Sequence, residues 1–122
     1  MAVNKQTIIN AIAEYCRAEN DKDKQAWLAL FAENIVHEDP VGMVSNAGKE
    51  KVAAFWDQMV VPNNVELWLT DEVIVCGNEA IALMQCRVGP ADKRQESGRI
   101  VDNFVFDDAG KITRVRAFYT YQ

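Results

Sequence analysis

The chain has 122 residues and a mass of 13.7 kDa, a length that suits one core, so we expect a single domain over residues 1–122. Apolar residues make up 49% of the sequence, yet no run is long enough to span a membrane, so we expect neither a disordered chain nor a membrane protein. The net charge is −5 and the 13 Lys and Arg side chains are scattered, which argues against a nucleic-acid partner.

Cysteine usage and the N-terminal segment predict a cytoplasmic protein. Cys16, Cys76 and Cys86 are odd in number, widely spaced and set among apolar neighbours, as is typical of free core thiols in a reducing compartment. The opening residues, MAVNKQTIIN, lack the apolar segment and cleavage site of a secretory signal. His37 is the only histidine, and it shares alternate strand positions with Asp39 but has no third candidate ligand nearby, so we expect neither a metal nor another cofactor.

Helical periodicity predicts three helices in the first half of the chain. The expected ranges are residues 7–20, 25–34 and 48–60. In the first helix, Ile8, Ile12 and Tyr15 recur at helical spacing, so Tyr15 should point inward. The second helix should bury Trp27 and Phe31 along its edge.

The remaining apolar runs predict β-strands. The expected strands are residues 34–39, 65–76, 79–88, 98–106 and 112–121, with a turn over 40–46. Helices followed by hairpins predict an α+β domain with an antiparallel sheet. One face of the strand at 79–88 carries Ala82, Met84, Cys86 and Val88, and this face lines either an apolar cavity or a packed core.

Two acidic residues stand in unusual positions. Asp102 shares a strand face with Ile100 and Phe104, so its carboxyl should be buried. Without a cation, burial would raise its pKa and keep it protonated; the alternative is an ion pair with a nearby arginine, namely Arg99, Arg114 or Arg116. Asp39 lies in HEDPVG, residues 37–42, which forms either an ordinary turn or a strand end that presents a carboxylate.

These segments together resemble a known family. Tyr15, ALFAENIVHEDPVG, GKEKVAAFW and RIVDNFVFDDAGKITRVRAFY are similar to the ketosteroid isomerases of the NTF2-like (SnoaL-like) superfamily over nearly the whole chain. The resemblance implies a cone in which three N-terminal helices pack on a strongly curved, mixed and mainly antiparallel β-sheet. It also implies a homodimer that associates through the outer face of the sheet.

The resemblance further implies the catalytic residues. Asp39 falls on the general base, which removes a proton next to the ketone of a small apolar substrate such as a steroid. Tyr15 and protonated Asp102 fall on the two hydrogen-bond donors to the enolate oxygen, a division of labour that depends on pKa tuning. Phe31 and Trp56 stand where some members carry tyrosines that bond to the catalytic tyrosine.

Eight residues are expected to form the substrate-binding wall. They are Phe55, Trp56, Met84, Cys86, Val88, Phe104, Val115 and Tyr119. The natural substrate does not follow from these residues, because such a wall would accept many flat apolar ketones.

Other activities occur on the same fold. An epoxide hydrolase would need an Asp, Arg, Asp relay inside the cone, although Arg99 and Asp102 lie on opposite strand faces. A cyclase or dehydratase would give His37 a role in proton transfer. The non-enzymatic alternative is a small-ligand binding protein whose acids are incidental.

Overall fold

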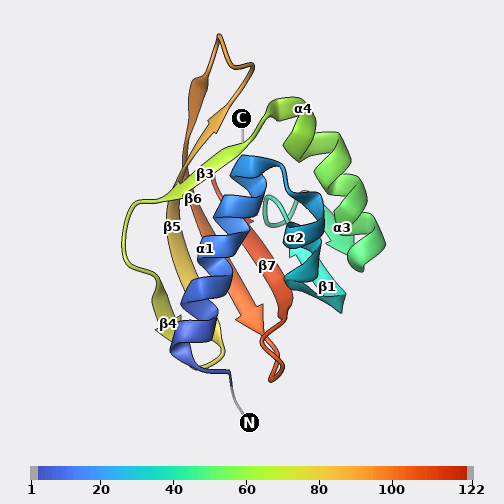
Figure 1. Cartoon of the computed structure of the whole chain (residues 1–122), viewed down its shortest axis with the longest axis vertical. Coiled ribbons are helices and arrows are strands. Elements are labelled where there is room, and N and C mark those ends of the chain that lie inside the picture. Colours follow the sequence, from blue (N-terminus) through green and yellow to red (C-terminus); the bar gives the residue numbers. More distant parts are fainter. Residues whose placement is uncertain (1–2, 121–122) are drawn as a thin grey trace.

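The structure is a computed structural model that describes residues 3–120 (Figure 1). The helical elements are α1 (Lys5–Asp21), α2 (Lys24–Ala29), α3 (Lys49–Phe55), the π-helical turn η1 (Trp56–Val60) and α4 (Val61–Asn63). The strands are β1 (Phe31–Glu38), β2 (Ser45–Ala47), β3 (Glu66–Leu69), β4 (Ile74–Cys76), β5 (Glu79–Val88), β6 (Gln95–Phe106) and β7 (Ile112–Phe118).

The strands form one seven-stranded, curved sheet, and helices α1 to α3 cover one of its faces (Figure 1). The strand order is β2-β1-β7-β6-β5-β3, and β4 also pairs with β5. Only β1 and β7 pair in parallel among the described strands; the other pairs are antiparallel. The predicted α+β fold, with N-terminal helices on a curved, mainly antiparallel sheet, is therefore confirmed.

The core lies between the sheet and the helices. Alternate side chains of β5 and β6 point toward α1 and form the sheet side of this core. Ala82, Met84 and Cys86 are buried on β5, and Asp102 and Phe104 are buried on β6. Residues between them on the same strands are only half-buried. This period-two pattern is the one that the sequence predicted for both strands, and it directs the Asp102 carboxyl inward.

Helix α1 positions two polar side chains on its buried face. Asn4 caps the helix by accepting a hydrogen bond from the Thr7 amide at 2.8 Å, and Lys22 closes it with a left-handed φ of 57°. Tyr15 and Glu19 lie one turn apart on the buried side. The inward orientation predicted for Tyr15 is confirmed, since its exposed fraction is 3%.

Several predicted boundaries are wrong. Phe31 begins β1 instead of continuing the second helix, because it pairs with Ile112 of β7. Within the predicted turn over 40–46, the chain already enters β2 at Ser45. The predicted strand at 65–76 is divided into β3 and β4, and the predicted strand at 112–121 ends at Phe118 in β7. Tyr121, its last predicted residue, lies outside the described residues.

The three cysteines are free, but they do not share one environment. Cys16 and Cys86 are buried, as predicted for core thiols. Cys76 is exposed at the end of β4, so the prediction is wrong for this residue. Within residues 3–120, no helix combines the length and the hydropathy that a membrane crossing requires.

Candidate active site

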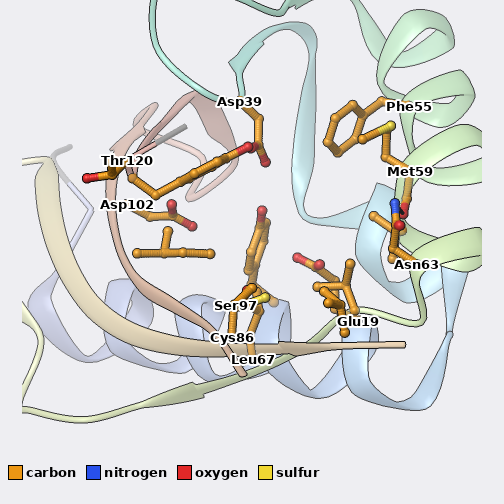
Figure 2. Close-up of a pocket in the computed structure, with 16 residues that line it drawn as sticks. Glu19, Asp39, Phe55, Met59, Asn63, Leu67, Cys86, Ser97, Asp102 and Thr120 are labelled. Atoms are coloured by element: carbon orange, nitrogen blue, oxygen red, sulfur yellow. Dashed lines mark hydrogen bonds between the residues drawn. The ribbon is translucent and has the colours of Figure 1, made fainter. Parts of the chain in front are cut away.

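A cavity of about 260 Å³ opens between the helices and the inner face of the sheet. It is lined by Tyr15, Glu19, Asp39, Phe55, Met59, Val60, Asn63, Val65, Leu67, Cys86, Val88, Ser97, Ile100, Asp102, Tyr119 and Thr120. Figure 2 shows that Glu19, Asp39 and Asp102 reach this space from different sides. The cavity is therefore largely apolar but contains three carboxyl groups and at least one buried phenol.

Asp39 follows β1 directly and lies at the edge of the cavity. Its Oδ1 accepts a hydrogen bond from the Tyr119 hydroxyl at 2.8 Å, which joins residues at the ends of the parallel strands β1 and β7. Burial raises the pKa of Asp39 to about 6, and the Tyr119 hydrogen bond limits that rise. At pH 7 the group is mostly a carboxylate, the form that can act as a base.

Asp102 lies on β6 in a more apolar setting. Its exposed fraction is 3%, and its Oδ1 atom has no hydrogen-bond partner within residues 3–120. Burial raises its pKa well above the ordinary value, and the charges of Asp39 and Glu19 raise it further. This shift favours the neutral form of the carboxyl, which can donate a hydrogen bond.

The arginines considered as partners for Asp102 are directed elsewhere. Arg114 and Arg116 lie 3.3 Å and 3.2 Å from Glu38 on the other face of the sheet. Arg99 is exposed. The alternative of an ion pair between Asp102 and one of these residues is therefore wrong.

Tyr15 is held by aromatic neighbours. Its ring packs edge-on against Phe104 with 5.1 Å between ring centroids, and against Phe31 at 6.3 Å. Burial raises the pKa of Tyr15 well above 10.0, and the charges of Glu19, Asp102 and Asp39 contribute further. The phenol therefore keeps its proton and remains a donor at neutral pH.

Glu19 is the site residue that sequence reasoning missed. Its exposed fraction is 4%, and burial raises its pKa to about 8. The charge of Asp39 adds to this rise, whereas the Tyr15 hydroxyl, Lys22 and the Trp27 indole oppose it. The signal was available in the sequence, because Glu19 continues the apolar stripe of α1 four residues after Tyr15.

The structure brings only part of the predicted wall to the cavity. Phe55, Cys86, Val88 and Tyr119 line it. Trp56, Met84, Phe104 and Val115 are buried but do not belong to this lining. Two of them pack on other aromatic rings: Trp56 on Trp27, with 4.9 Å between ring centroids, and Phe104 on Tyr15, with 5.1 Å.

His37 lies behind the cavity wall. Its ring is fully buried between Phe55, at 4.7 Å, and Trp27, at 6.1 Å. Neither ring nitrogen has a hydrogen-bond partner within residues 3–120, and Nε2 is 3.9 Å from Asp39 Oδ2. Burial lowers the pKa of His37 to about 4, so the ring is neutral at pH 7.

Known proteins share this fold. A Delta 5-3-ketosteroid isomerase from Mycobacterium sp. is 26% identical, with a TM-score of 0.82 and coverage of 93% of each chain. RV0760c from Mycobacterium tuberculosis, in complex with estradiol-17beta-hemisuccinate, is 25% identical, with a TM-score of 0.82 and coverage of 93% of this chain and 94% of that one. The epoxide hydrolase/cyclase-like enzyme SalBIII is 24% identical, with a TM-score of 0.85 over 96% of this chain and 93% of that one, a likeness of fold alone.

The family model for the SnoaL-like domain matches residues 12–115, a range that contains Tyr15, Asp39 and Asp102. This match covers most of the chain, and the sheet topology agrees with it. The predicted resemblance is thus confirmed at the level of the family. The chain belongs to the family of SnoaL-like domains, within the NTF2-like superfamily.

Proposed function

We propose that the protein is an isomerase that moves the carbon–carbon double bond of a β,γ-unsaturated ketone, such as a Δ5-3-ketosteroid, into conjugation with the carbonyl. The observation that carries this proposal is the contrast between two carboxyls in one cavity. Burial raises the pKa of Asp39 only to about 6, whereas the pKa of Asp102 is raised well above its ordinary value. One group is thus a base at neutral pH and the other is a hydrogen-bond donor.

In the proposed reaction the proton moves within the site. The Asp39 carboxylate removes a proton from the carbon α to the carbonyl, and the electron pair forms a dienolate. The Tyr15 hydroxyl and the neutral Asp102 carboxyl donate hydrogen bonds to the dienolate oxygen, where the negative charge develops. Asp39 then returns the proton to the γ carbon, which completes the isomerisation and restores the carboxylate.

The cavity lining disfavours two of the alternatives. An epoxide hydrolase relay needs an arginine between two carboxyls, and no arginine lines this cavity within residues 3–120. A cyclase or dehydratase that used His37 would need its ring to reach substrate, but His37 is fully buried behind the wall.

The direct test of the proposed function is an ultraviolet assay. We expect a Δ5-3-ketosteroid to be converted into its conjugated isomer, which absorbs more strongly because the double bonds are conjugated. A protein that binds the steroid but produces no conjugated isomer would be a binding module instead. RV0760c, whose structure contains estradiol-17beta-hemisuccinate, supports a steroid as the first ligand to try.

The proposal predicts an acidic limb in the pH profile. Because Asp39 must be ionised, kcat/KM should rise with pH through about 6 and fall about tenfold per pH unit below it. The Tyr119→Phe variant removes a hydrogen bond that stabilises the carboxylate, so its limb should move to higher pH. Rates between pH 4 and 8 provide the measurement, and identical limbs in both proteins would contradict this role of Tyr119.

We also propose that the protein forms a homodimer through the outer face of the sheet. Leu83, Val101 and Phe118 lie side by side in register across β5, β6 and β7 on this face. Phe118 is 43% exposed, and a partner would bury this apolar row. Light scattering at micromolar concentration should give twice 13.7 kDa, and Phe118→Lys should shift the protein toward the monomer. A wild-type mass of one chain would refute the proposal.

A further inference from the structure

Glu19 combines three properties that a structural glutamate seldom has. It is 4% exposed, it lines the same cavity as Asp39 and Asp102, and it stands one turn beyond Tyr15 on α1. Figure 2 shows its carboxyl on the cavity side of the helix. The nearest lysine, Lys22, donates to two backbone carbonyls, those of Glu19 at 2.8 Å and Val65 at 2.7 Å.

The surroundings of Glu19 are mainly acidic. The titratable groups that act on it or respond to its charge are Tyr15 and Cys16 of α1, Lys22 at the helix end, Asp39 after β1, Cys86 of β5 and Asp102 of β6. Three carboxyls in one desolvated cavity cannot all be ionised, because burial and mutual repulsion both favour the neutral forms. Only Asp39 among them accepts a hydrogen bond from Tyr119.

We propose that Glu19 is a positioning residue for Tyr15. Neutral Glu19 donates a hydrogen bond to the Tyr15 oxygen, which leaves the phenolic hydrogen free for the ligand. Ionised Glu19 can only accept, so it binds the phenolic hydrogen itself and withdraws it from the ligand. This inference rests on the proposed function, in which Tyr15 is a donor to the dienolate oxygen.

Two further observations support this role. Tyr15 and Glu19 both line the cavity from the buried face of α1, one helical turn apart, a spacing that brings the two side chains together, and the pKa of each group responds to the other. Phe31 and Phe104, whose rings pack edge-on against Tyr15, have no hydroxyl to offer it. Glu19 supplies the polar partner that these residues do not.

The first experiment follows Tyr15 itself and needs no substrate. With carbon-13 at the ζ position of tyrosine, the Tyr15 signal should shift with a midpoint near pH 8, where Glu19 ionises. The signal is identified by its loss in Tyr15→Phe. In Glu19→Gln the inflection should vanish, because the amide does not titrate. An inflection that persists in Glu19→Gln, or a wild-type signal without one, would overturn the proposal.

Glu14→Gln is the matched control for this experiment. Glu14 lies on the same helix, but its carboxyl is on the surface and binds Arg17 at 2.6 Å. Its variant should keep the wild-type inflection of Tyr15. If the inflection of the Tyr15 signal were lost in Glu14→Gln as well, its cause would be a general change in the helix and not the ionisation of Glu19.

The second experiment measures turnover. Wild-type isomerisation should decline above about pH 8 as Glu19 ionises, and Glu19→Gln should lack this decline. Glu19→Met keeps the length but removes the donor, so kcat should fall about tenfold at pH 7, the effect of one hydrogen bond, while KM changes less. A wild-type kcat in Glu19→Met would overturn the proposal. If no variant turns over a ketosteroid, the proposed function fails, and the Tyr15 titration alone decides the role of Glu19.

Discussion

Asp39→Asn should lower isomerisation by about two to four orders of magnitude, because the amide keeps the shape of the side chain and removes the base. The Tyr119 hydroxyl can still donate to the amide oxygen, so the end of β1 should remain in place. Ligand affinity should therefore change little, and the loss should fall on kcat. The ultraviolet assay gives the rate, and steroid binding measured by fluorescence gives the affinity.

Glu38→Gln is the matched control for the Asp39 variant. Glu38 is the preceding residue, but its carboxyl pairs with Arg114 and Arg116 away from the cavity. Neutralising Glu38 should leave the rate within a few-fold of wild type, because its carboxyl is directed toward the two arginines and does not line the cavity. Equal rates for Asp39→Asn and wild type would mean that another group is the base.

Asp102→Leu should lower kcat by about 100- to 1,000-fold, or about 2.7 to 4 kcal/mol of barrier, the effect of removing one donor to a developing oxyanion. Asp102→Asn retains an N–H donor in the same position, so it should lose less. This ranking depends on a neutral Asp102, which its burial and its unpartnered Oδ1 atom favour. A carboxylate at this position would repel the dienolate instead.

Both Asp102 variants should fold, because each replaces a buried group of high pKa by one that carries no charge. Circular dichroism and thermal unfolding check this before rates are compared. Asn and Leu variants of equal activity would show that Asp102 is not a donor. A carbon-13 carboxyl signal of Asp102 that titrated near 3.8 in the free protein would lead to the same conclusion.

The features that sequence predicted well are those with a regular period. Alternation along β6 placed Asp102 on the buried face, and the helical spacing of α1 turned Tyr15 inward. Both signals are local, because the direction of a side chain depends on its position within its own element. These patterns show which way a side chain points, but not which residue of a distant segment it contacts. The hydrogen bond from Tyr119 to Asp39 could therefore not be predicted from the sequence.

The features that sequence missed depend on contacts between distant segments. Phe31 continues an apolar helical pattern, yet pairing with Ile112 of β7 makes it the first residue of a strand. Ser45–Ala47 is too short to display alternation, so β2 was read as part of a turn. Trp56 and Phe104 have the expected burial, but they pack on other aromatic rings and do not line the cavity. Tertiary context overrides local pattern at each of these positions.

Three buried carboxyls also couple the folding of the chain to proton uptake. A carboxyl whose pKa is higher in the folded chain than in the unfolded chain binds a proton on folding, so its contribution to the free energy of unfolding falls as pH rises between the two values. For Asp39 this interval runs from 3.8 to about 6, and for Glu19 from 4.5 to about 8. For Asp102 the interval also begins at 3.8 and runs toward higher pH. The carboxyls of the proposed site thus move the pH of greatest stability toward acid. Activity requires ionised Asp39 and is therefore expected at a higher pH.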